Sequence, residues 1–154
     1  MNNPRLAAAR ALLQVFRDGA YSNLTTTRLF AELDSRDRAF AAALFYGVLE
    51  RAVTLDWAMG AYSKTPVDRM TPAVRQMLRC GVYQLLYMPA VPPSAAVNET
   101  VQLTRLMGEA KAAGFVNGVL RAFARQNGRY PLPKDKLTAS AVEYGVPAPL
   151  IAQW

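Results

Sequence analysis

Residues 71–87 contain the feature that most constrains the fold, a helix whose two ends are both marked in the sequence. Thr71 can cap the free amides at the start, and Pro72 suits the first helical position. Pro89 ends the helix, because the residue before a proline is pushed out of the helical region. Apolar residues recur between these ends at steps of three and four, namely Val74, Met77, Leu78, Val82 and Leu85. The stretch therefore predicts an amphipathic helix with one face buried among other helices.

The remaining positions of this helix predict two further properties. Gly81 lies within the apolar stripe, so a neighbouring helix could approach closely there. The opposite side carries Arg75, Arg79 and Tyr83, four residues apart in succession. We predict that this second side is exposed and is available for binding.

Helical patterns of the same kind cover the rest of the chain as far as Gln126. Ser22-Asn23 and Ser35 are the expected N-caps of two of these helices, and a break is expected near residues 52–54. The predicted helices span residues 4–18, 23–33, 40–51, 55–62, 94–107 and 112–126. No stretch alternates as a strand would, so the predicted fold class is all-α, a helical bundle.

The composition changes after residue 127. Proline and glycine crowd the remaining residues, where the pattern allows a short helix at 137–144. We therefore expect a helical domain at residues 1–127 and a linker at residues 128–154. The apolar run at 150–154 has nothing after it, which favours a domain cut from a longer protein.

Charge and composition favour nucleic acid as the partner. The net charge is +7, and 14 of the 18 basic residues are arginine, which suits bidentate phosphate contacts and stacking on bases. No signal-peptide pattern and no long uncharged apolar stretch is present, so we expect a cytoplasmic protein without a membrane partner.

Candidate catalytic residues are nearly absent. The chain has no histidine and a single cysteine, Cys80, so no Ser-His or Cys-His pair and no cysteine metal site can be built. Cys80 lies among apolar neighbours, where a buried, inert thiol is the simpler interpretation. We expect no catalytic, metal or cofactor site in this chain.

Three polar strips, each on one side of a predicted helix, form the candidate binding site. Arginine offers phosphate contacts and tyrosine a stacking face, the combination that holds single-stranded RNA. The strips are Arg10, Gln14 and Arg17; Arg75, Arg79 and Tyr83; and Asn117, Arg121 and Arg125. Each strip alone could be an ordinary solvated face. Gly114 and Gly118 lie beside the third, where they indicate either tight helix packing or close approach of a phosphate backbone.

Several short segments together resemble one family. They are Ser35-Arg36-Asp37-Arg38-Ala39-Phe40, Tyr46-Gly47-Val48-Leu49, Thr54-Leu55-Asp56-Trp57, Leu78-Arg79-Cys80-Gly81-Val82-Tyr83-Gln84-Leu85, Val97-Asn98-Glu99 and Gly114-Phe115-Val116-Asn117-Gly118-Val119-Leu120-Arg121. This set resembles the N-terminal domain of the RsmB (Sun/Fmu) ribosomal RNA cytosine-5 methyltransferases, which is itself similar to the antitermination factor NusB. The match covers most of residues 5–125.

The resemblance implies an RNA-binding domain that positions ribosomal RNA. Under this resemblance, Arg10 and Gln14 correspond to the arginine-rich first helix of NusB, which contacts RNA. The correspondence is weaker for Arg5, because Ala7-Ala8-Ala9 stand where NusB has further basic residues. The family's catalytic cysteines and S-adenosylmethionine site would lie beyond Trp154. The tail from Tyr144 departs from the family's Tyr-Ser-His-Pro at Gly145-Val146.

Two other functions remain open from the sequence. The same faces could dock a protein, either the chain's own C-terminal methyltransferase domain or a ribosomal protein. A stand-alone antitermination factor is the other alternative.

Overall fold

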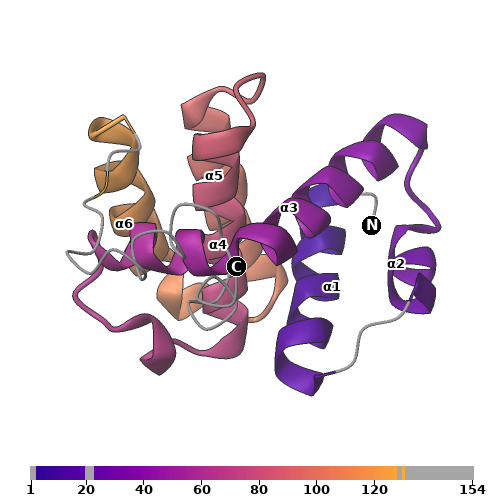
Figure 1. The fold of residues 1–154 in the computed structure, drawn as a ribbon, viewed down its shortest axis with the longest axis horizontal. Coiled ribbons are helices and arrows are strands. Elements are labelled where there is room, and N and C mark those ends of the chain that lie inside the picture. The colour runs from indigo at the N-terminus through magenta and orange to yellow at the C-terminus, as the bar shows by residue number, and fades with distance from the viewer. Residues whose placement is uncertain (1–2, 20–22, 128–129, 131–154) are drawn as a thin grey trace, which may run out of the picture.

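The computed structural model describes residues 3–19, 23–127 and Tyr130, and these form helices with no strand among them (Figure 1). The elements in chain order are α1 (Pro4–Asp18), α2 (Asn23–Phe30), α3 (Ser35–Gly60), the 3-10 turn η1 (Val67–Arg69), α4 (Pro72–Tyr87), α5 (Pro93–Leu106), the 3-10 turn η2 (Ala110–Ala112) and α6 (Ala113–Arg125). The all-α prediction is confirmed. The predicted linker and the short helix at 137–144 lie outside the described residues.

Helix α4 is the centre of the bundle and has the predicted ends. The Thr71 hydroxyl accepts a hydrogen bond from the Val74 amide, and Pro72 occupies the first turn. Helices α1, α3, α5 and α6 all contact it. Its apolar face is completely buried at Met77, Leu78 and Val82. A helix this enclosed derives its stability mainly from packing.

Gly81 is the point where α4 meets two other helices. A Cβ atom built on it would lie 2.8 Å from both terminal methyl carbons of Leu120 in α6 and 3.3 Å from Thr100 Cγ2 in α5. The predicted close approach at this glycine is therefore confirmed.

Helix α1 begins and ends as predicted, whereas α2 is shorter than predicted. Gly19 has φ of 69°, the left-handed conformation typical of a residue after a helix. Helix α2 ends at Phe30 and not near Leu33. The Arg38 guanidinium, from the first turns of α3, donates to the carbonyl oxygens of Phe30, Ala31 and Leu33 and satisfies the end of α2.

Two predictions about α3 need correction. Its N-cap is Asp34, whose Oδ1 accepts from the Asp37 amide at 2.8 Å, and Ser35 is already helical. The helix continues to Gly60 with a break at Arg51 (φ −119°, ψ 20°), slightly before the predicted region. The break turns the second half of α3 across α4.

The last two helices differ from the predictions by about one residue at their starts. Helix α5 begins at Pro93 and α6 at Ala113, directly after η2. Leu120 of α6 is completely buried. Phe16 of α1 is 40% exposed although it is a large apolar residue. Within the described residues, none of the helices has both the length and the apolar character required to cross a membrane.

Candidate nucleic-acid interface

The predicted exposed side of α4 is instead partly covered, and only Arg79 on it is buried. Its side chain is 7% exposed and forms a two-pronged ion pair with Asp56 of α3, with Nε–Oδ1 and Nη2–Oδ2 distances of 2.7 Å. Its Nη1 donates to Gln76 Oε1 at 3.2 Å, and its guanidinium carbon lies 4.3 Å from the centre of the Phe16 ring. Arg79 therefore joins three helices, and each of its three nitrogens already donates a hydrogen bond within the protein.

The other two members of this strip also have structural contacts. Arg75 donates from Nε to the Val67 carbonyl at 3.1 Å and from Nη2 to the Met70 carbonyl at 3.2 Å, which holds η1 against α4. The Tyr83 ring occupies the space where a Cβ of Gly47 would be, so it packs on α3. Because α3 covers it, the strip is not the open cationic surface that its spacing predicted.

The α1 strip is exposed and extends toward α2. Gln14 Oε1 accepts from Arg28 Nη2 of α2 at 3.3 Å, and Arg17 pairs with its neighbour Asp18 at 3.0 Å. Arg10 is exposed and has no hydrogen bond or ion pair within the described part of the chain. Arg10 therefore stays a predicted RNA contact.

The α6 strip is exposed and organised. Arg121 Nε donates to Asn117 Oδ1 at 2.8 Å, one turn back, and Arg121 Nη2 lies 3.5 Å from Asn98 Oδ1 of α5. Arg121 and Arg125 line a hollow of about 320 Å³ with Pro93, Ser94, Val97 and Ala124. This hollow places two guanidinium groups beside the first turn of α5.

A second hollow lies on the other side of the same turn. It measures about 420 Å³ and its lining comes from α1, α3, α5 and the loop before α5: Pro4, Arg5, Arg36, Asp37, Phe40, Ala90, Val91, Pro92 and Ala95. Arg5 is half-buried, donates from Nε to Gln84 Oε1 at 2.7 Å and stacks on Phe40, 4.8 Å from the ring centre. Burial lowers the pKa of Arg5, and the charge of Glu99 opposes this shift. Arg36 is exposed.

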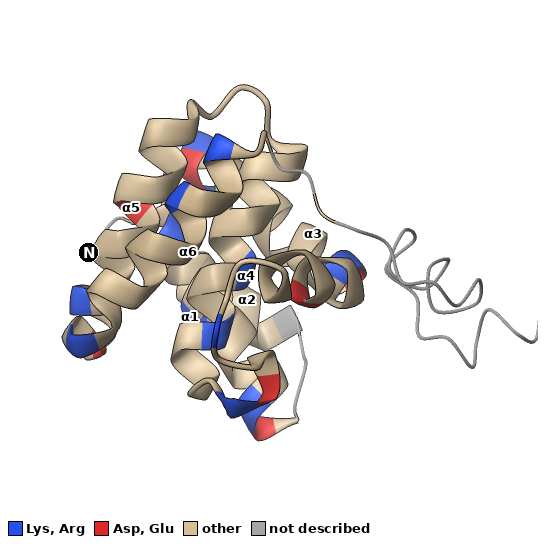
Figure 2. Ribbon diagram, turned by 90° about the vertical axis from the view of Figure 1, so that its left-hand side faces the viewer, with Lys and Arg blue, Asp and Glu red and all other residues tan. Residues whose placement is uncertain are grey.

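These two hollows and the start of α5 between them form what we call the α5 surface, defined by Arg5, Arg36, Arg121 and Arg125. The N-terminal ends of α3 and α5 and the C-terminal end of α6 lie along the same upper edge of the molecule (Figure 1). Figure 2, which looks onto α5 and α6, shows basic segments on both helices.

No side chain caps α5, so the partial positive charge of its free amides adds to that of the arginines. Asp37 is the acidic member of the lining. The surface as a whole attracts anions.

Half of the α5 surface was missed by the strip analysis. Arg121 and Arg125 were predicted site residues, but Arg5 and Arg36 come from the starts of two other helices. Arg5 had only the weaker carry-over from the first helix of NusB, and Arg36 was named only within a segment that resembles the family. Only the packing of α1 and α3 against the loop before α5 brings them to the same hollow.

The glycines beside the α6 strip lie on open surface. A Cβ on Gly114 or Gly118 would meet nothing within 4 Å, which excludes tight helix packing as the reason for either glycine. Both line a hollow of about 270 Å³ with Lys64 and Phe115. Close approach of a phosphate backbone at these positions stays a prediction.

Cys80 is completely buried, as its apolar neighbours predicted. Burial raises the pKa of its thiol to about 12, so the thiolate needed for nucleophilic attack is rare at neutral pH. In the described residues no three acidic or cysteine side chains gather as a metal site requires.

The chain matches one protein-family model and several ribosomal RNA methyltransferases. Residues 2–125 match the model of the NusB family. The chain is 31% identical over 150 residues to the protein named "Probable ribosomal RNA small subunit methyltransferase B" of Bacillus subtilis, covering 96% of this chain and 33% of that protein. It is 36% identical over 124 residues to ribosomal RNA small subunit methyltransferase B of Sodalis glossinidius, covering 80% and 28%.

A solved structure shares the fold. T. maritima NusB superposes with a TM-score of 0.70 at 23% identity, over 82% of this chain and 91% of that chain. By contrast, the chain spans about a third of the length of the methyltransferases that it matches. The family model covers four fifths of the chain, and the fold agrees with it, so this chain belongs to the NusB family.

Proposed function

We propose that this chain is the RNA-binding domain of an RsmB-like ribosomal RNA methyltransferase, and that it holds ribosomal RNA for a catalytic domain elsewhere in the protein. The names of the matched relatives support the class of enzyme. The α5 surface supports the mode of binding and is the observation on which the proposal depends most.

The α5 surface has the chemistry that a single-stranded phosphate backbone requires. Four guanidinium groups line two hollows, and the start of α5, which has no side-chain cap, lies between these hollows. Guanidinium groups form paired hydrogen bonds with phosphate oxygens, and helix amides favour the same anions. Phosphate contacts of this kind fix the position of RNA without selecting a base sequence. This is the property that a positioning domain needs.

The methyl transfer itself belongs to the remainder of the longer protein in this proposal. The chain offers one thiol, which is buried. The cysteine nucleophile and the S-adenosylmethionine site of such an enzyme would therefore be supplied by the catalytic domain. The α5 surface would direct the target strand toward that domain.

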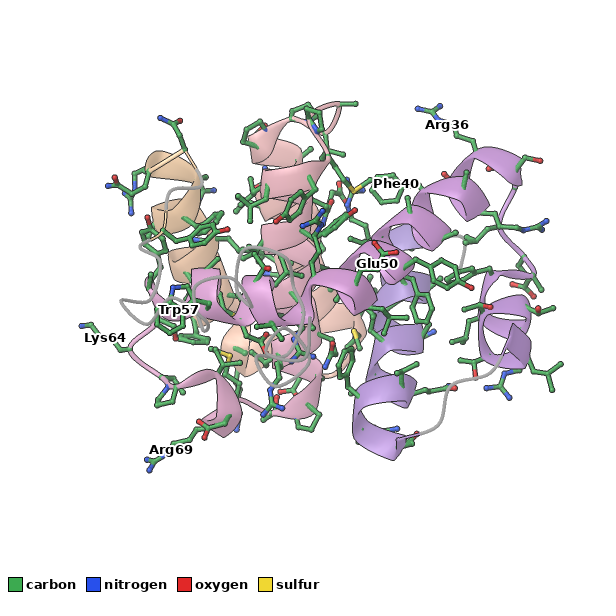
Figure 3. All side chains as sticks on the ribbon, in the orientation of Figure 1. Arg36, Phe40, Glu50, Trp57, Lys64 and Arg69 are labelled. Carbon is green, nitrogen blue, oxygen red and sulfur yellow. The ribbon has the colours of Figure 1, made fainter. Side chains whose placement is uncertain are left out.

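Charge removal at single positions tests the proposal. We expect Arg36→Ala and Arg121→Ala to weaken binding of a ribosomal RNA fragment, while Arg69→Ala leaves it unchanged. Arg69 is the matched control, because it is also exposed and lies at the opposite end of the molecule from Arg36 (Figure 3). Equal binding by all three variants would refute the α5 surface as the RNA site.

A protein-docking role is the second candidate, and one observation favours it. A hollow of about 510 Å³ between α2 and α3 has a largely uncharged lining with one arginine: Thr26, Thr27, Phe30, Ala31, Arg38, Ala42 and Tyr46. Leu24 on α2 is 77% exposed and Tyr46 is 42% exposed. Apolar surface of this kind suits a protein partner better than RNA. Tyr46→Ala that abolishes docking of the catalytic domain, with RNA binding intact, would establish this role beside the first.

A further inference from the structure

Arg51 has an unusual position in α3. It is the residue with non-helical backbone angles, so the helix changes direction at this point. Its guanidinium carbon lies 4.5 Å from the centre of the Tyr87 ring at the end of α4. An arginine at the break in α3 therefore lies over an aromatic ring of α4.

A second ring extends this stack. The Tyr83 and Tyr87 rings lie one helical turn apart on α4, with their centres 5.1 Å apart and their planes tilted by 38°. All three side chains are half-buried, so none is enclosed in the core. Burial is also the main reason that the pKa of Tyr83 is raised, and it therefore stays neutral at physiological pH.

Arg51 differs from the other partly buried arginines in its hydrogen bonds. Arg5 donates to Gln84, Arg75 to two backbone carbonyls, and Arg79 to Asp56. Arg51 has neither a hydrogen bond nor an ion pair anywhere in the described part of the chain. The Arg51 side chain is partly buried, yet its N–H donors have no acceptor among the described residues. A group held by stacking alone, with its donors free, is suited to a ligand that stacks and accepts hydrogen bonds.

We propose that Arg51, Tyr87 and Tyr83 form a nucleobase-stacking site, in which an unpaired base of the bound RNA lies on the outer face of the Arg51 guanidinium. This inference rests on the proposed RNA binding and adds a base contact to the phosphate contacts of the α5 surface. Arginine planes and tyrosine rings are the usual stacking partners of unpaired bases. The free donors of Arg51 can reach the base edge or the adjoining phosphate.

The position of the site agrees with this assignment. Tyr87 is the last residue of α4, and the loop that follows supplies Ala90, Val91 and Pro92 to the hollow that Arg5 and Arg36 line. Phe40 of that hollow and Glu50, the neighbour of Arg51, lie on the same side of the molecule in Figure 3. A strand that follows the α5 surface therefore has this site next to it. Glu50 is the acidic group beside the site and disfavours a phosphate there, which leaves stacking as the stronger attraction.

Fluorescence of a base analogue tests the site directly. The probe is an oligouridylate with one 2-aminopurine placed in turn at each position, because stacking quenches this base. We expect quenching with the unaltered chain at one or more probe positions, because phosphate contacts without base selection allow several registers on this homopolymer. Arg51→Lys keeps the charge but loses the flat stacking surface, so it should abolish the quenching. Tyr87→Leu should do the same, and Tyr87→Phe should preserve it. The affinity of the first two variants should fall roughly five- to hundredfold, the range for losing one stacked base.

Each outcome separates this inference from the proposed function. RNA binding by the unaltered chain without quenching at any position would overturn the stacking site and leave the α5 surface standing. The same holds if folded Arg51→Lys binds and quenches like the unaltered chain. Failure of the unaltered chain to bind RNA at all would refute the proposed function, and the stacking site with it. The quenching measurement with the unaltered chain needs no variant, so it tests the stacking site even if a substitution disturbs folding.

Discussion

Arginines that look alike in the sequence have opposite roles in this molecule. Arg79 and Arg121 both belong to strips of polar residues spaced along one helix side. The Arg79 side chain is 7% exposed and paired with Asp56, whereas Arg121 is exposed beside a hollow. The difference arises from which face a neighbouring helix covers. The spacing of residues within one helix does not contain that information.

Arg79→Ala should therefore destabilise the fold before it affects binding. Removal leaves Asp56 without its partner, and we expect the free energy of unfolding to fall by about 2–3 kcal/mol, below the range for fully buried pairs because the Asp56 side chain is 30% exposed. Urea denaturation measures this. Arg125→Ala is the exposed control and should change stability by about 0.5 kcal/mol or less. Equal stability of the two variants would show that the ion pair contributes little.

At the scale of the elements, the contact of α4 with α5 and α6 depends on a missing side chain. Gly81 lets Leu120 and Thr100 approach the α4 backbone. Gly118 of α6 is also helical, but nothing lies near it. The two glycines should therefore respond oppositely to substitution.

Gly81→Leu should lower the midpoint of thermal unfolding, because the added side chain overpacks the contact at a cost of roughly 1–3 kcal/mol. Gly118→Ala should raise the midpoint, since alanine is favoured over glycine in a helix interior by about 0.8–1.0 kcal/mol. Differential scanning calorimetry of the two variants gives both values. A Gly81→Leu protein that melts at or above the unaltered chain would show that the helices do not pack tightly there.

The helices themselves could largely be predicted from the sequence because their ends have local causes. Thr71-Pro72 before α4 and Gly19 after α1 act within a few residues, and both were predicted. Asp34 and Ser35 are both good N-cap residues, so the choice between them depended on the geometry of the preceding turn. Phe16 is exposed because its partner is the Arg79 guanidinium at the edge of the core. Its apolar spacing could not show this.

The candidate site was predictable only in part. Arg121 and Arg125 share one helix face, which the 3.6-residue period reveals. Arg5 and Arg36 join them across helices that are far apart in the chain, so tertiary packing alone places them there. The Arg51 stack likewise depends on the break in α3.

At the scale of the whole molecule, the chain combines the proposed binding surface with a single thiol, which is buried. We expect no methyl transfer to RNA by this chain, because burial raises the pKa of Cys80 to about 12 and closes it to substrate. Incubation with ribosomal RNA and radiolabelled S-adenosylmethionine measures the activity. Label in the RNA that disappears with Cys80→Ala would contradict the division between binding and catalysis.

The dependence of RNA affinity on salt tests the α5 surface most directly. Each phosphate contact releases condensed cations, so the logarithm of the affinity falls with the logarithm of the salt concentration by about 0.7 per contact on single-stranded RNA. We predict that the Arg121→Ala, Arg125→Ala double variant flattens this slope by roughly 1.4, twice the value for one contact. Arg36→Ala should flatten it by about 0.7, and Arg69→Ala should leave it unchanged. An unchanged slope in the double variant and in Arg36→Ala, with the fold intact, would contradict the assignment of RNA to this surface.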